Sequence, residues 1–116
     1  MMQILRISQP MIGKARPRVT HNGTFMPKPY QQWQKGAQAE LRLQWSGRSP
    51  LERISWITVQ FRSASGRVDL DNALGSVLDA LVQAGVLRDD NATRVPAVTA
   101  TWDRSDRNDI LITLEA

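Results

Sequence analysis

Hydrophobic positions along the chain follow helical spacing in two segments. Apolar side chains recur at every fourth position over residues 29–45, which predicts a helix with one buried face. A second helix is predicted over residues 72–84, where an apolar stripe is followed by Gly85, a residue suited to end a helix. The two stripes consist of Trp33, Ala37, Leu41 and Trp45 in the first helix and Leu74, Val77, Leu78 and Leu81 in the second.

Alternating or β-branched apolar positions predict four strands, at residues 3–8, 54–62, 94–102 and 109–115. A small hairpin is expected over residues 18–26, because His21-Asn22-Gly23-Thr24 is a tight-turn signal. The polar segment 103–108 is expected to be a hairpin loop between the last two strands. This order predicts an α/β fold, with residues 1–116 in a single compact domain that has a mixed β-sheet and two main helices.

Charge is distributed unevenly along the chain. Residues 1–67 hold 11 Lys and Arg against two acids, a net of +9, and residues 68–116 hold four Arg against nine acids, a net of −5. A basic first half can contact phosphates and steer a polyanion. The acidic second half repels DNA unless some of its charge is neutralised, for example by a bound divalent metal. Pairing between the halves and solvated surface charge explain the distribution equally well.

The composition excludes several classes of protein. The chain has no Cys, so disulfides, thiolate zinc sites and a cysteine nucleophile are excluded. No apolar stretch approaches the roughly 20 residues that span a bilayer, and the N-terminus lacks the organisation of a signal peptide. A cytoplasmic protein with no membrane partner is therefore expected. The one histidine, His21, lies in a predicted turn and is expected to face solvent, so a Ser-His triad is not indicated.

Aspartates flank the second predicted helix. Asp69 and Asp71 precede it, and Asp89 and Asp90 follow it in a turn. On extended backbone the two-residue spacing puts Asp69 and Asp71 on the same side, and a returning strand could bring Asp90 back toward them. Mg²⁺ prefers such oxygen ligands. Helix capping by the first pair and turn formation by the second explain the same residues without a metal.

The segment that spaces these aspartates resembles the signature of RusA-family Holliday junction resolvases. The likeness lies in Val68-Asp69-Leu70-Asp71-Asn72, Val77-Leu78-Asp79-Ala80-Leu81 and Ala84-Gly85-Val86-Leu87-Arg88-Asp89-Asp90, with ungapped spacing throughout. Upstream, the basic region common in phage-type members is matched by Lys14-Ala15-Arg16-Pro17-Arg18-Val19-Thr20 and Met26-Pro27-Lys28. The resemblance covers most of the chain and is strongest over residues 67–95.

The resemblance implies a homodimeric, Mg²⁺-dependent endonuclease that resolves four-way DNA junctions by paired, symmetric nicks. In this sequence Asp69, Asp71 and Asp90 match the catalytic, metal-binding carboxylates. The residues expected to contact the DNA backbone are Lys14, Arg16, Arg18 and Lys28. An enzyme of this kind is expected at the bacterial nucleoid or in a phage-infected host cell.

Gly75 departs from the family pattern, which has a lysine one turn after the second aspartate. Either another basic residue such as Lys14, Arg16 or Arg18 substitutes, or turnover is reduced; a close approach to DNA or a partner helix would also explain the glycine. Two alternatives therefore stay open, a nuclease selective for forks or flaps and a junction-binding protein with weak catalysis. Structural roles are expected for Asp79 and Asp89, and core or dimer contacts for Trp33 and Trp45.

Overall fold

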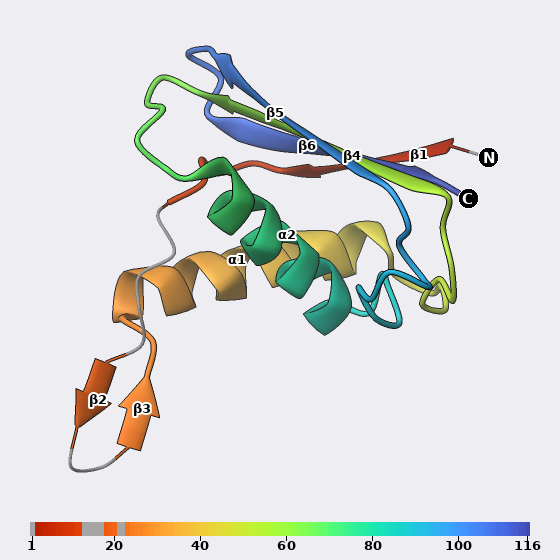
Figure 1. The fold of residues 1–116 in the computed structure, drawn as a ribbon, viewed down its shortest axis with the longest axis horizontal. Coiled ribbons are helices and arrows are strands. Elements are labelled where there is room, and N and C mark those ends of the chain that lie inside the picture. The colour runs from red at the N-terminus through yellow and green to blue at the C-terminus, as the bar shows by residue number, and fades with distance from the viewer. Residues whose placement is uncertain (1, 13–17, 21–22) are drawn as a thin grey trace.

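Two helices pack against one face of a four-stranded sheet (Figure 1). This computed structural model describes residues 2–12, 18–20 and 23–116. The elements of this main body are β1 (Met2–Ile7), α1 (Lys28–Gln44), β4 (Trp56–Ser63), α2 (Leu70–Gln83), β5 (Val98–Arg104) and β6 (Asp109–Glu115). The predicted α/β architecture, a single compact domain with a mixed sheet and two helices, is therefore confirmed.

The sheet has the strand order β1-β6-β4-β5 and is mixed. β6 runs antiparallel to both β1 and β4, whereas β5 runs parallel to β4. The chain from β4 through α2 to β5 is thus a crossover connection, the arrangement that parallel neighbours require. Consequently α2 begins near the carboxyl end of β4, and the segment after α2 leads to the opposite end of the sheet, where β5 starts (Figure 1).

The prediction that residues 103–108 form a hairpin loop between the last two strands is wrong. β4 lies between β5 and β6, so the turn after Arg104 carries the chain across the end of β4. The backbone N–H of Ser105 donates to the Ser63 carbonyl (3.0 Å), and that of Ala64 donates to Asn108 Oδ1 (3.2 Å). Asn108 has a φ of 52°, in the left-handed region that Asn tolerates better than most residues. Consecutive strands are usually neighbours, but here the crossover places one strand between them.

β5 begins four residues later than the pattern of residues 94–102 predicts and ends two residues later. Asn91 Oδ1 accepts the backbone N–H of Arg94 (3.1 Å), which closes a turn, and Pro96 has no N–H to donate to a strand ladder. Val95 lies in this turn and its side chain is buried in the core. Its apolar character is therefore explained by core packing and not by a strand. The other strand and helix bounds of the main body agree with the prediction to within two residues.

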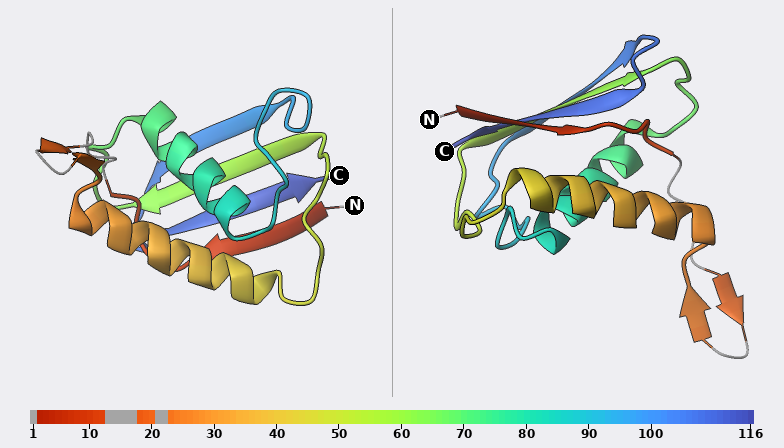
Figure 2. Two further views of the ribbon diagram at one scale, coloured as in Figure 1. Left: turned by 90° about the horizontal axis from the view of Figure 1, so that it is seen from below. Right: turned by 180° about the vertical axis from the view of Figure 1, so that it is seen from behind.

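The core lies between the helices and the sheet face that they cover. Alternate residues of β4 and β6 are almost fully buried there, and each such side chain contributes roughly 1.5–3 kcal/mol. Trp33 and Trp45 belong to this core, each 3% exposed, and their indole N–H groups donate to the carbonyls of Pro10 and Ser49, both at 3.0 Å. Neither helix covers the other sheet face (Figure 2), where the side chain of Trp56 remains exposed.

A small hairpin stands apart from the sheet, beside the start of α1 (Figures 1 and 2). It consists of β2 (Arg18–Thr20) and β3 (Gly23–Phe25), paired antiparallel with Arg18 opposite Phe25. Gly23 has a φ of 111°, a conformation open to glycine and to few other residues. The expected hairpin over residues 18–26 is confirmed. None of the helices in the described segments is both long and apolar enough to cross a membrane.

Candidate functional site

Asp69 and Asp71 lie together at the start of α2, next to the carboxyl end of β4. Asp69 is the N-cap residue, with extended backbone angles (φ −65°, ψ 128°), whereas Asp71 already lies in the first helical turn. The expectation that both residues are on extended backbone is therefore wrong, because the helix begins at Leu70 rather than at residue 72. Both carboxylates are exposed to solvent at the positive end of the helix dipole.

The Asp69 carboxylate does not cap the helix, although Asp69 occupies the capping position. Its Oδ2 accepts a long hydrogen bond from Asn72 Nδ2 (3.4 Å) and none from the backbone of the first turn. Asp71 Oδ1 accepts the backbone N–H of Asn72 (2.9 Å). Each carboxylate therefore keeps unused lone pairs that face solvent.

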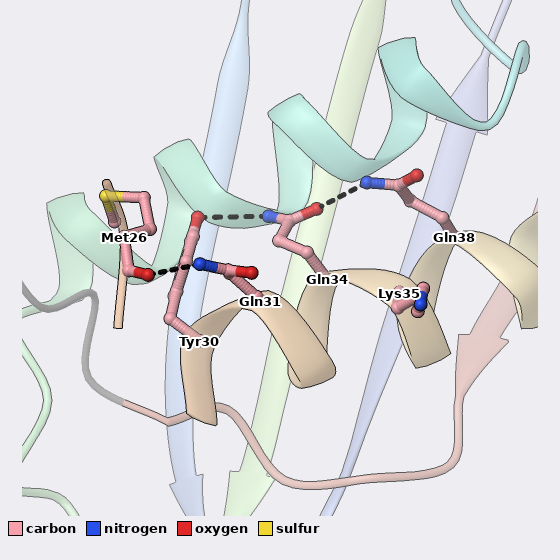
Figure 3. A pocket seen from close by; sticks show the side chains of 6 residues that line it. All are labelled: Met26, Tyr30, Gln31, Gln34, Lys35 and Gln38. Carbon is pink, nitrogen blue, oxygen red and sulfur yellow. Dashed lines mark hydrogen bonds between the residues drawn. The ribbon is translucent and has the colours of Figure 1, made fainter. Parts of the chain in front are cut away.

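A buried polar network fixes the beginning of α2 against α1. The fully buried Ser76 donates its hydroxyl to the Asn72 carbonyl (3.1 Å) and accepts the hydroxyl of Tyr30 (3.1 Å). Gln34 Nε2 donates both to the Tyr30 hydroxyl (3.0 Å, Figure 3) and to the Ser76 carbonyl (2.9 Å). No buried side-chain donor or acceptor in the described segments lacks a partner. The helical turn that follows Asp69 and Asp71 is therefore held rigidly by α1.

A surface groove of about 300 Å³ follows this row of side chains on α1 (Figure 3). Its lining consists of Met26, Tyr30, Gln31, Gln34, Lys35 and Gln38. Among the described residues that line it there is no carboxylate and no histidine, the side chains that most often bind Mg²⁺ or Zn²⁺. The two aspartates at the start of α2 therefore remain the chemical candidates on this side of the sheet.

Asp90 lies beyond the opposite end of α2 from Asp69 and Asp71. The helix has 14 residues, which separates its ends by about 20 Å at roughly 1.5 Å per residue. After Asp90 the chain enters β5 at its amino end, whereas Asp69 follows the carboxyl end of the parallel strand β4. The chain thus does not return Asp90 to the pair. Within the described ranges, no three His, Asp or Glu side chains are grouped to hold a metal ion.

The turn that carries Asp90 has a defined shape. Asp89 Oδ1 accepts the backbone N–H of Asp90 (2.7 Å), the structural role expected of Asp89. Arg94 and Arg88 pair with Glu52 at 2.8 and 2.9 Å. The hydrogen bond from Arg94, and then that from Arg88, lowers the pKa of Glu52 below its ordinary value. These contacts join both ends of the turn to Glu52, and Asp90 lies exposed between them.

Of the predicted DNA contacts, only Lys28 has a described side chain. It is exposed at the first residue of α1. Arg18 lies in β2, on the hairpin beside the start of α1, but its side chain is outside the described set. Lys14, Arg16 and His21 lie outside the described residues altogether. The hairpin and the beginnings of both helices lie at the same end of the molecule (Figure 1).

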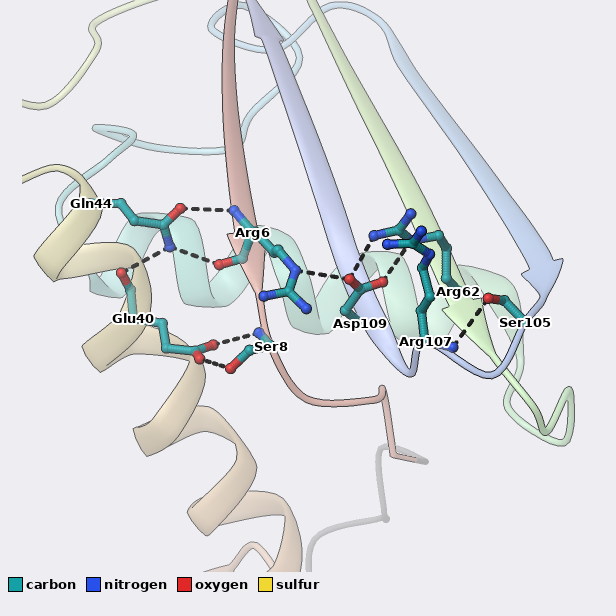
Figure 4. Close-up of polar contacts among 8 residues, drawn as sticks. All are labelled: Arg6, Ser8, Glu40, Gln44, Arg62, Ser105, Arg107 and Asp109. Atoms are coloured by element: carbon teal, nitrogen blue, oxygen red, sulfur yellow. Dashed lines mark hydrogen bonds and ion pairs between the residues drawn. The ribbon is translucent and has the colours of Figure 1, made fainter.

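Sequence reasoning missed a cluster of arginines around Asp109 (Figure 4). Asp109 is 1% exposed, and its Oδ1 and Oδ2 accept Arg62 Nε and Nη2, both at 2.6 Å. Arg6 Nε also donates to Oδ2 (2.8 Å). The hydrogen bonds from Arg62, and then Arg6, hold the pKa of Asp109 below its usual value against the opposing effect of burial. The sequence feature that could have indicated this cluster is that Arg62 and Asp109 are charged residues at the ends of two predicted strands.

Gly75 lies one turn after Asp71, on the outward side of α2. A Cβ at this position would meet no atom of another described part of the chain within 4 Å, so no contact among the described residues requires glycine. Three half-buried apolar residues run along the edge of the same outward side, at four-residue spacing: Leu74, Leu78 and Val82. The outward side of α2 therefore has both an apolar stripe and room for close approach by another helix.

One family model matches almost the whole chain. Its description is endodeoxyribonuclease RusA, and the match runs over residues 9–115. The matched region includes both helices, three of the four sheet strands in full and all three of the predicted catalytic aspartates. No individual curated protein matches the chain.

Proposed function

The chain belongs to the RusA family of endodeoxyribonucleases, and from that membership we propose that it resolves four-way DNA junctions by Mg²⁺-dependent, paired and symmetric nicks. The observation that carries this proposal is the pair of exposed carboxylates, Asp69 and Asp71, at the start of α2. We further propose that the enzyme acts in the cytoplasm, at the bacterial nucleoid or in a phage-infected host. The basic segment that includes Lys14, Arg16, Arg18 and Lys28 is proposed to grip the DNA backbone.

The donor set at the start of α2 fits Mg²⁺. Mg²⁺ usually takes one or two protein carboxylates and completes its shell with water and substrate phosphate. Asp69 and Asp71 offer oxygen ligands only; Asp69 makes no capping bond, and Asp71 uses one oxygen, Oδ1, to accept the Asn72 N–H. When bound, the ion would neutralise phosphate charge and lower the pKa of a water molecule. The network that joins Tyr30, Gln34 and Ser76 would keep the two carboxylates oriented.

A second copy of the chain would supply the third carboxylate. Asp90 is about 20 Å from the pair in its own chain, close to the length of α2. If two α2 helices pack antiparallel about a two-fold axis, the partner's Asp90 comes beside Asp69 and Asp71 at each end. The apolar stripe on α2 favours such a contact. We therefore propose a homodimer with two shared sites, which suits paired cuts in a two-fold junction.

A panel of synthetic branched DNAs tests the proposed function. With Mg²⁺, a mobile four-way junction is expected to receive paired nicks at symmetric positions, with ends that ligase can seal. Linear duplex, forks and flaps are expected to be cut much more slowly. Preferential cutting of forks or flaps would instead identify a branched-DNA nuclease. Tight junction binding with no cutting in Mg²⁺ would identify a junction-binding protein and refute the catalytic proposal.

Replacing Gly75 with lysine is expected to speed junction cleavage by roughly tenfold or more, because it adds a positive charge one turn from Asp71, near the developing negative charge. The new side chain has room within its own chain. It also removes a helical glycine, which costs roughly 1 kcal/mol relative to alanine. The measurements are single-turnover cleavage and thermal unfolding. Gly75→Ala is the matched control, and an equal rate for the two variants would show that charge at this position is not limiting.

A further inference from the structure

Three arginines gather at one end of the uncovered sheet face (Figure 4). Arg6 belongs to β1 and Arg62 to β4, and both donate to the buried carboxylate of Asp109 at the start of β6. The neighbours of Arg62 in β4, Phe61 and Ser63, are buried, so the alternation of the strand directs Arg62 away from the helices. Arg107, two residues before Asp109, extends toward the Arg62–Asp109 pair in Figure 4.

Asp109 orients these guanidinium groups without neutralising them. Arg62 uses Nε and Nη2 in the pair, and Arg6 uses Nε alone, so both keep N–H groups for another acceptor. The Arg6 side chain is 53% exposed, and Arg107 is exposed, with no ion pair to any residue that the structure describes. Three cations against one anion leave a positive excess. Oriented guanidinium groups with unused donors match the geometry of a phosphate.

Acidic residues at the same edge do not cancel this excess. Asp103 and Asp106 lie on β5 and in the following loop, and the Asp103 carboxylate accepts a hydrogen bond from Gln60. Arg104 ends β5, and Arg67 lies in the loop before α2, both exposed. Apart from Arg67, which adjoins Asp69 and Asp71, this edge thus carries four arginines against three aspartates, Asp109 included.

The arginines are held at the same end of the sheet as Asp69 and Asp71. Arg62 is the second-last residue of β4, and the loop after this strand leads directly to Asp69. That loop is tied to β5 and to the 105–108 turn, since Trp102 Nε1 donates to the Ser65 carbonyl (2.9 Å) and Ser105 N donates to the Ser63 carbonyl. In Figure 1 the start of α2 lies between this end of the sheet and the β2–β3 hairpin.

On the basis of the proposed function, we propose that Arg6, Arg62 and Arg107 bind the phosphate backbone of the DNA. This contact would lie on the side of the aspartate pair that is opposite the hairpin. A strand that passes over the aspartates is then held on both sides of the bond to be cut. Contacts of this kind set position and affinity and carry no base preference. The arginines therefore form a second phosphate-binding surface, separate in the fold from the basic hairpin segment.

Removal of two of the charges tests this surface. In an Arg6→Gln, Arg107→Gln variant, Asp109 keeps its two hydrogen bonds from Arg62, so the fold is expected to persist. Junction affinity without Mg²⁺ is measured between 50 and 200 mM salt. We expect affinity to fall about tenfold at the lower salt, and the slope of log K against log salt to decrease by about one to two. An Arg42→Gln, Arg53→Gln variant removes equal charge from exposed positions elsewhere and is expected to keep the wild-type slope.

The outcomes separate this inference from the proposed function. If the wild type cuts junctions and the Arg6/Arg107 variant keeps the wild-type affinity and slope, the phosphate contact is refuted and the nuclease stands. Equal losses in both double variants also refute the contact, because net charge then explains the effect. If the wild type never cuts, the proposed function fails, while the salt slopes still decide the contact. Should the double variant unfold, the single Arg107→Gln variant gives the same comparison, because that side chain has no ion pair in the described structure.

Discussion

Replacement of Asp71 by asparagine is expected to abolish junction cleavage and to leave junction binding intact. Asn72 donates its backbone N–H to Asp71 Oδ1 at 2.9 Å, and an asparagine side-chain oxygen can accept the same bond. The local helix start is therefore retained, and what is lost is a negative charge and a strong ligand for the proposed ion. Loss of one such electrostatic group commonly costs about 10²–10³ in rate, so cutting is expected to fall by at least that factor.

The comparison uses a mobile four-way junction, with nicks scored on denaturing gels and binding on native gels in the same buffer. Asp79→Asn removes an equivalent charge two turns further along α2, from an exposed position with an expected structural role, and serves as the matched control. Wild-type cutting by Asp71→Asn would exclude this aspartate from the mechanism. Loss of binding together with cutting would show a structural defect instead.

A mixture of Asp71→Asn and Asp90→Asn chains is expected to regain cleavage that neither variant has alone. In the proposed dimer each site combines Asp69 and Asp71 of one subunit with the partner's Asp90. A mixed dimer then has one site that carries both substitutions and one site that carries none. Since only one site per dimer is intact, we expect single, unpaired nicks in the junction.

The two variants are unfolded and refolded together, and mixed dimers are isolated through two different affinity tags. Each variant refolded alone provides the background, and the wild type carried through the same steps provides the maximum. If all three aspartates of a site came from one chain, every site in the mixed dimer would lack a carboxylate and no nicks would appear. This inactivity of the mixture would contradict the shared site without touching the assignment of Asp71.

The helices and most strands could be predicted because their apolar spacing is local information. Trp33 on α1 and Trp45 at its C-cap, separated by a multiple of four residues, both reach the core. The pairing of strands was harder to predict, because each partner is chosen by the whole sheet. β5 pairs with β4 through the α2 crossover, so the polar turn before Asp109 could not become a hairpin. Boundary shifts followed from local turn chemistry, as at Asn91, where a side chain closes a turn inside an apolar run.

The candidate site was predictable in part for the same reason. Asp69 and Asp71 are neighbours in sequence, and the segment around them carries the family pattern. The distance of Asp90 from the pair depends on the length and direction of α2 within the fold, which spacing alone does not give. The arginine cluster was invisible because Arg6 and Asp109 are 103 positions apart. Counting charge by halves also concealed it, since the fold brings arginines from both halves to one edge.

The position of β6 in the sheet determines when the protein can fold. β6 is the last strand in chain order, yet it lies between β1 and β4 and is the hydrogen-bonded partner of both. β1 therefore has no partner strand in the described sheet until residues 109–115 are available. Closure of the sheet, and with it the support beneath α2, therefore requires β6. A chain that ends before β6 would lack the antiparallel partner of both β1 and β4, so the sheet that supports α2 would not assemble.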